Sequence, residues 1–487
     1  MTMTIQDLLS KLRGALALPP FPESFMFGVA TADHQCEPYD PDVEDIRDKW
    51  EREHGQTMRG RATDFRNRYK EDVELARQLG CKMFRFSISW SRVEPRPGLF
   101  SKADFDFYRR LIAAIRDAGM EPIVTLHHFV WPLHVEARGG LIAPGFPDLY
   151  ARYVQEVVNR LGQGLKYWIT FNEPSQLIYG YIKPFWVKEY YVPPGLPPGA
   201  SADDQIAAIG ALIRNLFVAH SRARAIIKAA NPDALVGANP LLLGLPFWLQ
   251  RFINWNATRL RTQADLGRQV KRFASEPVPP TLLPEKSPLK PWLEWLLEPI
   301  LKPVAIVSTM VAANWWHLGM AGQLPEFLCP GECVGQQDYV GLDYYWGINT
   351  LQLHRIAALI GSGFGHFDKA PVWPSALHEH LKFHARLFPK LPILIIENGS
   401  VEVADQVDRP TYLRKHVEQV QYALRDGANV TAYIVWAITS NREWGLHFDA
   451  ASDFGLYHIE LDTDPDLARA PTPSSLAYQS IIANRGT

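Results

Sequence analysis

Two apolar segments of the chain each run out on a glutamate. KYWITFNEP carries Glu173 near its end, and ILIIENG carries Glu397 near its end. Cleavage of a glycosidic bond by double displacement uses two carboxyl groups with different roles. One, protonated, releases the leaving group, while the other, ionised, attacks the anomeric carbon. Either glutamate alone could simply be a solvated residue at the end of a strand. Whether the two act together depends on whether the fold brings their strand ends to the same face.

Eight short, β-rich apolar runs alternate with amphipathic helical segments along the chain. Eight is the number of parallel strands in a closed (β/α)8 TIM barrel, a fold whose active sites lie at the C-terminal ends of the strands. The predicted fold is therefore a single α/β barrel that presents Glu173 and Glu397 on the same face. The candidate strands are residues 25–30, 83–88, 123–128, 167–173, 235–239, 339–345, 393–397 and 431–438.

The segments between these strands carry ordinary helix signals. Apolar residues at helical spacing precede Gly80, Gly119 and Gly427, each a predicted C-terminal cap, and Pro410 suits the first turn of the last of these helices. A chain of 487 residues accommodates one large barrel. We expect an N-terminal amphipathic segment over residues 1–20 and a catalytic barrel over 21–487, which includes an insertion at about 241–310.

Composition limits the classes of partner, the state of the cysteines and the cellular location that we expect. A net charge of −2 gives no reason to expect a nucleic-acid partner, which would require a basic surplus. The four cysteines fit neither a disulfide framework nor a common zinc pattern, so reduced thiols are expected. Charged residues interrupt the apolar N-terminus, and no clean cleavage site follows it, so no signal peptide is predicted. The expected location is cytoplasmic, with the insertion as a candidate for membrane association.

Between about residues 21 and 482, and with a break at the insertion, the chain resembles glycoside hydrolase family 1. Seven ordered segments carry the resemblance: FPESFMFGVATADHQCE, FRFSISWSR, TLHHFVWP, TFNEP, DYVGLDYY, IIENG and VWAITSNREW. The resemblance implies a retaining β-glycosidase with Glu173 as acid/base and Glu397 as nucleophile. We expect their carboxyl groups to lie about 5–5.5 Å apart, as retention requires.

The same resemblance assigns the surrounding side chains. Arg85 and Tyr345 would contact Glu397, and a guanidinium and a phenol O–H both favour an ionised carboxylate. Asn172 would bond the 2-hydroxyl of the sugar, where a contact that tightens in the transition state contributes to the rate. The residues expected to bind the sugar are Gln35, His128, Trp436, Glu443 and Trp444. No metal or organic cofactor is expected, because carboxyl groups cover both halves of the reaction.

Five positions depart from the usual residues of the family, among them Phe129 and Val130, which replace a Trp-Asp pair. Asp343 stands in place of an asparagine, which puts a third carboxyl group near the nucleophile. Ser440 and Arg442 replace an aspartate and an aromatic residue. These changes leave both catalytic glutamates in place, but the glycone preference stays open.

The insertion has the composition of an interfacial segment. LLLGLPFWLQRFINW and PLKPWLEWLLEPILKPVAIV are largely apolar, and six basic residues but one acidic residue lie between Arg251 and Arg272. Apolar bulk with Trp beside Lys or Arg is typical of a segment that lies on a membrane without spanning it. A lid buried against the barrel or a second subunit has the same composition. Both interpretations stay open, and so does the oligomeric state.

Three functions fit the sequence. The leading one is a retaining exo-β-glycosidase that hydrolyses β-D-glucosides, galactosides or fucosides. The alternative is a transglycosylase or hydrolase that acts on membrane glycolipids, because the segments ENGSVEVADQVDRPTYLRKH and LARAPTPS resemble the plant galactolipid-remodelling galactosyltransferases of the same family. A non-catalytic glycan-binding barrel ranks last, since both glutamates are present. In each case the partner is a carbohydrate or a glycolipid.

Overall fold

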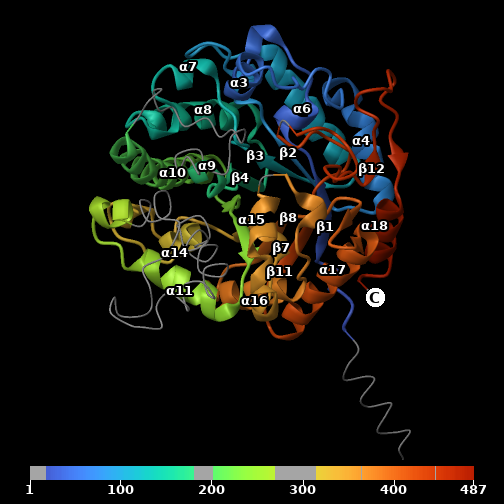
Figure 1. Ribbon diagram of the computed structural model, residues 1–487. Helices are drawn as coiled ribbons and strands as arrows, with labels where there is room; N and C mark the ends of the chain where they lie inside the picture. Colours follow the sequence, from blue (N-terminus) through green and yellow to red (C-terminus); the bar gives the residue numbers. More distant parts are fainter. Residues whose placement is uncertain (1–17, 180–200, 269–313, 364, 445, 487) are drawn as a thin grey trace, which may run out of the picture.

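The computed structural model describes residues 18–179, 201–268, 314–363, 365–444 and 446–486 (Figure 1). Most of the predicted N-terminal amphipathic segment, residues 1–17, lies outside this range. So does the part of the insertion over residues 269–313. Within the described ranges, helices surround a central parallel sheet, as the barrel prediction requires (Figure 1).

All eight predicted strands are present and parallel. Their hydrogen-bonded order around the barrel is β5-β4-β3-β2-β1-β11-β8-β7, and a ninth strand, β6 (Leu241–Gly244), pairs with β7. The buried, β-branched and aromatic character of these runs suits strands covered on both faces. Their bounds are β1 Met26–Ala30, β2 Met83–Ser87, β3 Glu121–Thr125, β4 Tyr167–Asn172, β5 Leu235–Asn239, β7 Val340–Gly347, β8 Ile393–Asn398 and β11 Val430–Val435. The predicted (β/α)8 barrel is confirmed.

The fifth barrel strand is divided in two. β5 pairs with β4, and after Pro240 the chain continues as β6, Leu241–Gly244, which pairs with β7. A proline has no N–H to donate to a ladder, so a strand is naturally interrupted there. The backbone N–H of Asp343 donates to the Pro240 carbonyl at 3.1 Å. Residues 241–244, which the sequence assigned to the insertion, therefore form part of the barrel wall.

The outer helices begin and end where the sequence signals predicted. α4, Phe65–Leu79, buries Tyr69, Val73, Ala76 and Leu79, and it is followed by Gly80 at φ +88°. A residue at positive φ terminates a helix at least cost when it is glycine. The other long helices are α6 Lys102–Asp117, α8 Phe146–Leu161, α10 Ala202–Ala230, α16 Ser375–Leu387, α17 Arg409–Arg425 and α18 Pro473–Ala483.

Shorter elements occupy the loops. The helices are α2 Asp33–Cys36, α3 Ile46–Glu53, α5 Trp90–Val93, α7 Leu133–Glu136, α9 Gln176–Tyr179, α11 Phe247–Thr258, α14 Trp315–Met320 and α15 Ile356–Ser362. Two small antiparallel pairs are β9 Val403–Ala404 with β10 Val407–Asp408, and β12 Tyr457–His458 with β13 Ala470–Pro471. All four cysteines are buried and free.

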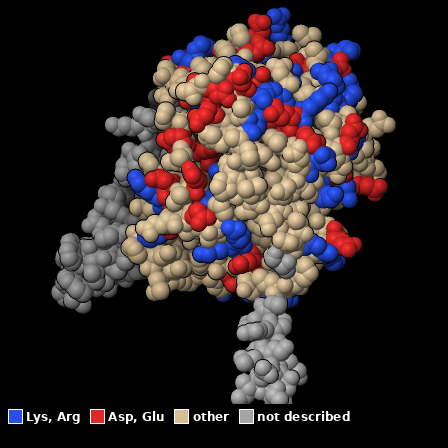
Figure 2. Space-filling view, turned by 90° about the vertical axis from the view of Figure 1, so that its right-hand side faces the viewer, with Lys and Arg blue, Asp and Glu red and all other residues tan. Residues whose placement is uncertain are grey.

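Charged side chains of both signs are interspersed on the face shown in Figure 2, around a central uncharged area. This mixture agrees with the net charge of −2 and with the absence of a basic surplus. Within the described ranges, no helix is both long and apolar enough to cross a bilayer.

Candidate active site

The two strand-end glutamates meet at the C-terminal end of the barrel. Glu397 is the fifth residue of β8, and Glu173 directly follows β4. One oxygen of each lies within 4.8 Å of the other, and an oxygen of Asp343 lies within the same distance of both. Inverting glycosidases separate their carboxyl groups by about 6.5–9.5 Å to make room for water, so this spacing corresponds to the retaining geometry.

Glu397 is held through both of its carboxylate oxygens. Arg85 donates from Nη1 to Oε1, and Tyr345 donates its hydroxyl proton to Oε2 at 2.7 Å. Both donors are buried, as is Glu397 itself. Charge-assisted hydrogen bonds of this kind are strong, and they fix the direction of the carboxylate lone pairs. The arrangement suits a carboxylate that attacks an electrophilic carbon.

Arg85 is immobilised by the strands on its side of the barrel. Its Nε donates to Thr125 Oγ1 at 2.9 Å, and its Nη2 donates to Asn172 Oδ1 at 2.7 Å. Its side chain is fully buried. A guanidinium with donors fixed on three sides cannot swing away from Glu397, so its charge stays at the carboxylate.

Glu173 has the opposite environment. Burial, followed by the nearby charges of Glu397 and Glu443, raises the pKa of Glu173 well above its usual range. Its backbone lies at φ +36°, and its N–H donates to the Asn239 carbonyl at 3.1 Å. Left-handed backbone at a non-glycine residue costs free energy and concentrates at functional sites. A protonated, buried carboxyl beside an ionised one can act as a proton donor.

An amide and an imidazole adjoin the carboxyl pair, because Asn172 bonds both Arg85 and His128. Asn172 donates from Nδ2 to His128 Nε2 at 3.3 Å, which leaves the Nδ1–H of that histidine without a partner among the described residues. Burial, followed by the charge of Arg85, lowers the pKa of His128 well below its usual value. His128 is therefore neutral and presents one free donor to a bound molecule.

Aromatic rings and polar ends form the adjoining wall. His128 stacks on Trp436 and on Trp444, with ring centres 5.7 and 5.9 Å apart. Trp436 donates its indole N–H to Glu443 at 2.9 Å, while burial raises the pKa of Glu443 to about 8. Gln35 donates to Asn441 at 2.8 Å, and its Oε1 has no partner among the described residues. Flat rings with unpaired polar atoms between them suit a sugar ring.

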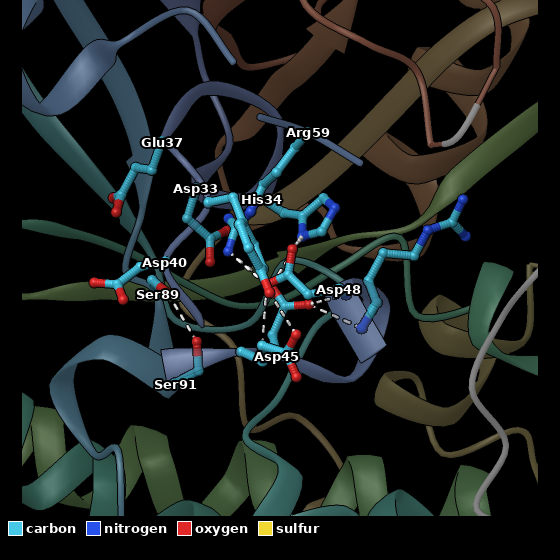
Figure 3. A network of polar contacts seen from close by, with 12 residues as sticks. Asp33, His34, Glu37, Asp40, Asp45, Asp48, Arg59, Ser89 and Ser91 are labelled. Carbon is cyan, nitrogen blue, oxygen red and sulfur yellow. Dashed lines mark hydrogen bonds and ion pairs between the residues drawn. The ribbon is translucent and has the colours of Figure 1, made fainter. Parts of the chain in front are cut away.

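A buried network of charged side chains, which includes His34, Asp45, Asp48 and Arg59 (Figure 3), adjoins this wall at Trp444. His34 stacks on Trp444 with ring centres 5.5 Å apart, and its Nδ1 bonds Asp45 at 2.8 Å. Although burial opposes the charge, the Asp45 carboxylate raises the pKa of His34 to about 9. Arg59 lies beside Asp48 at 2.6 Å. Buried charges of both signs compensate one another here, and they fix the ring on which Trp444 rests.

The structure brings together every predicted site residue. Sequence reasoning missed Asn239, which donates to Asn172 Oδ1 and to Asp343 Oδ2, each at 2.6 Å. Its signal was available, because it ends the fifth predicted strand just before a proline. His34 and its network were also missed, since their roles depend on residues that come together only through folding.

Two of the unusual positions lie outside the carboxyl centre. Ser440 donates to Asp453 at 2.9 Å and accepts from the backbone N–H of Ile459 at 2.9 Å. Arg442 forms an ion pair with Asp462. Both therefore hold the loops after β11 rather than the two glutamates.

Comparisons with known proteins point to one family. The family model described as glycosyl hydrolase family 1 matches residues 18–242 and 366–487. Beta-glucosidase A of Acetivibrio thermocellus is 25% identical over 495 residues, covering 96% of this chain and 99% of its own. The cytosolic beta-glucosidase of Homo sapiens is 26% identical and covers 86% of this chain and 87% of its own.

A solved structure shares the fold across nearly the whole chain. The beta-glucosidase of Thermotoga maritima in complex with glucoimidazole superposes with a TM-score of 0.67 at 25% identity, covering 96% of this chain and 99% of its own. The family model does not match residues 243–365. That segment contains α11 as well as Asp343 and Tyr345. The active site therefore combines residues inside the matched ranges, such as Glu173 and Glu397, with residues outside them.

Proposed function

The chain belongs to glycosyl hydrolase family 1, and we propose that Glu173 and Glu397 carry out its reaction on β-D-glucosides, galactosides or fucosides. The enzyme is a glycoside hydrolase of the retaining β-glycosidase type. The observation that carries the residue assignment is the pair of unlike carboxyl environments. Glu397 is ion-paired with Arg85, while the buried Glu173 has no ion-pair partner among the described residues. One oxygen of each glutamate lies within 4.8 Å of the other.

The first step forms a glycosyl-enzyme. Oε1 or Oε2 of Glu397 attacks the anomeric carbon while Glu173 transfers its proton to the leaving oxygen. The glycosidic C–O bond breaks, an ester bond to Glu397 forms, and the aglycone departs as an alcohol. Arg85 and Tyr345 hold the carboxylate in line for this attack, so little reorganisation is needed.

The second step returns the enzyme to its starting state. Glu173, now ionised, removes a proton from water, whose oxygen attacks the anomeric carbon and breaks the ester. The sugar leaves with its original anomeric configuration. Esterification has by then removed the charge on Glu397, which would otherwise keep Glu173 protonated, so the loss of that repulsion helps Glu173 act as a base.

The sugar contacts follow from the unpaired buried atoms. We propose that Gln35 Oε1 accepts from a sugar hydroxyl, that His128 Nδ1–H donates to one, and that Trp436 stacks against the ring. Asn172, Glu443 and Trp444 complete this group. A buried polar atom without a hydrogen bond costs free energy, and a hydrogen bond from a sugar hydroxyl to that atom removes the cost.

The proposal is tested with nitrophenyl β-glycosides of glucose, galactose and fucose. Proton NMR of the first product should show the β-anomer appearing before mutarotation. If the α-anomer appears first, the two-step assignment is wrong. If none of the glycosides is cleaved, the proposed substrate class is wrong.

A second proposal concerns the aglycone side. The described part of the insertion includes α11, on which four aromatic side chains are about half exposed, at 53, 52, 48 and 51%: Phe247, Trp248, Phe252 and Trp255. The guanidinium groups of Arg251 and Arg259 lie 5.4 and 4.4 Å from the rings of Phe247 and Trp255. Exposed rings with basic groups beside them suit the interface of an anionic bilayer.

We therefore propose that α11 contacts anionic membranes and that the enzyme reaches glycolipid headgroups from there. Of the six basic residues from Arg251 to Arg272, Lys271 and Arg272 lie outside the described range. The test is co-sedimentation with phosphatidylserine vesicles at low and high salt. The variant W248S/F252S should lose most binding, while L351S, at an exposed leucine of another loop, should not. Equal binding by all three proteins, or none by the wild type, contradicts the proposal.

A further inference from the structure

A third carboxyl group lies beside the catalytic pair. Asp343 on β7 is directly opposite Glu397 on β8 in the strand register. Its side chain is fully buried, and one of its oxygens lies within 4.8 Å of an oxygen of Glu173 and of Glu397. Three carboxyl groups are therefore close together, although the two-step reaction uses only two.

The contacts of Asp343 differ from those of the catalytic nucleophile. Its Oδ2 accepts from Asn239 Nδ2 at 2.6 Å, but its Oδ1 has no partner among the described residues. The nearest guanidinium, Arg85, is committed to Glu397, Thr125 and Asn172. A buried carboxylate with one neutral donor and no ion pair is costly, and it is usually relieved by taking up a proton.

The charges that face Asp343 point the same way. The carboxyl groups of Glu397 and Glu173 face it from β8 and from the end of β4, and Arg85 faces it from β2 as the opposing cation. Burial, followed by Glu397 and Glu173, raises the pKa of the Asp343 carboxyl well above its usual range. One guanidinium can balance the charge of one carboxylate. We therefore expect the other two carboxyl groups, Glu173 and Asp343, to be protonated in the resting site.

We propose that Asp343 is a positioning residue of the catalytic centre, carried as the neutral acid, whose Oδ1–H donates into the space between Glu173 and Glu397. This inference rests on the proposed roles of those two glutamates. Asn239 fixes Oδ2 as the acceptor, which leaves Oδ1 to carry the proton. Asp343 keeps that proton through both steps and gives none to the substrate. Its contribution is to orient a carboxylate oxygen without adding a negative charge beside Glu397.

The consequence is a pH dependence that the substitution D343N should remove. When Asp343 ionises, a donor is lost and a second negative charge appears beside Glu397, which competes for Arg85. In the wild type, deprotonation of Glu173 conceals this event. The variant E173Q removes that titration, and a dinitrophenyl glycoside has a leaving group that departs without a proton. The burst of dinitrophenolate then reports only the attack by Glu397.

The experiment compares the burst rate of E173Q with that of E173Q/D343N across neutral and alkaline pH. The rate of E173Q should fall about tenfold per pH unit above the ionisation of Asp343, because each unit reduces the neutral form tenfold. The double variant should show no such fall, since an amide of the same shape also donates and cannot ionise. A fall in both, which would point to Glu443, or a flat profile in both, overturns the proposal.

A second measurement does not depend on activity. The infrared difference spectrum of the wild type minus D343N at neutral pH should show the C=O absorption of a protonated carboxyl group. A carboxylate band in its place overturns the proposal. The variant D338N is the matched control, because Asp338 precedes the same strand but pairs with Arg224 at 2.6 Å. If dinitrophenyl glycosides give no burst in any protein, the proposed function fails, while the infrared result still decides the state of Asp343.

Discussion

The hydroxyl of Tyr345 donates a hydrogen bond of 2.7 Å to Oε2 of Glu397. Removal of a hydrogen bond to a charged group costs about 1.5–3 kcal/mol, which corresponds to a factor of about 10–100 in rate. We expect Y345F to lower kcat/KM by that factor, measured with a nitrophenyl glycoside. The neighbouring Tyr344 bonds the Trp373 carbonyl instead, at 2.6 Å, so Y344F should affect stability more than rate. Equal losses of kcat/KM in the two variants would show that the Tyr345 hydroxyl has no specific role in the reaction.

Replacement of the proposed nucleophile should separate its role from that of the rest of the pocket. E397A should abolish turnover, because no carboxylate remains to form the glycosyl-enzyme. Azide or formate that enters the vacated space attacks from the same face and should partly restore cleavage, with an inverted product. Product configuration is read by NMR. Activity like that of the wild type without an added anion would exclude Glu397 as the nucleophile.

The buried imidazolium of His34 makes stability depend on pH. Its pKa in the folded protein is about 9, compared with about 6.5 when unfolded, so its contribution is fully present below about pH 6.5. It is lost as the pH rises to about 9, by about 3 kcal/mol at most. The unfolding free energy of H34Q should therefore fall less over this window than that of the wild type, measured by urea titration.

His458 provides the comparison for His34. Its hydrogen bond to Asp453 also raises its pKa to about 9, but its side chain is 36% exposed. Solvent screens an ion pair at that exposure, so H458Q should alter the slope less than H34Q. Parallel pH curves for H34Q and the wild type would show that His34 is neutral in the folded protein.

Activity should not require a metal. Two groups of acidic and histidine side chains in the described ranges are close enough to hold a cation, but carboxyl groups alone account for both halves of the reaction. Dialysis against a chelator should leave kcat unchanged, with metal content checked by mass spectrometry. Loss of activity that a divalent ion restores would overturn this expectation.

The sequence by itself determined the elements and singled out Glu173 and Glu397 as the proposed catalytic pair. Alternation of apolar runs and amphipathic segments is a local property, so strands such as 167–173 and 393–397 could be read without knowledge of their neighbours. The glutamate at the end of each strand followed from the same local pattern. Helix ends at Gly80 and Gly427 were equally accessible, because a cap is set by a few adjacent residues.

Only the tertiary structure decided how these groups affect one another. The proximity of Asp343 to both glutamates, the bridge that Asn239 makes to it, and the network behind His34 all join segments far apart in the chain. The division of the fifth strand at Pro240 also depends on how the barrel closes. Burial and charge act through space, and the protonation state of a carboxyl depends on every group around it, so no local pattern contains that information.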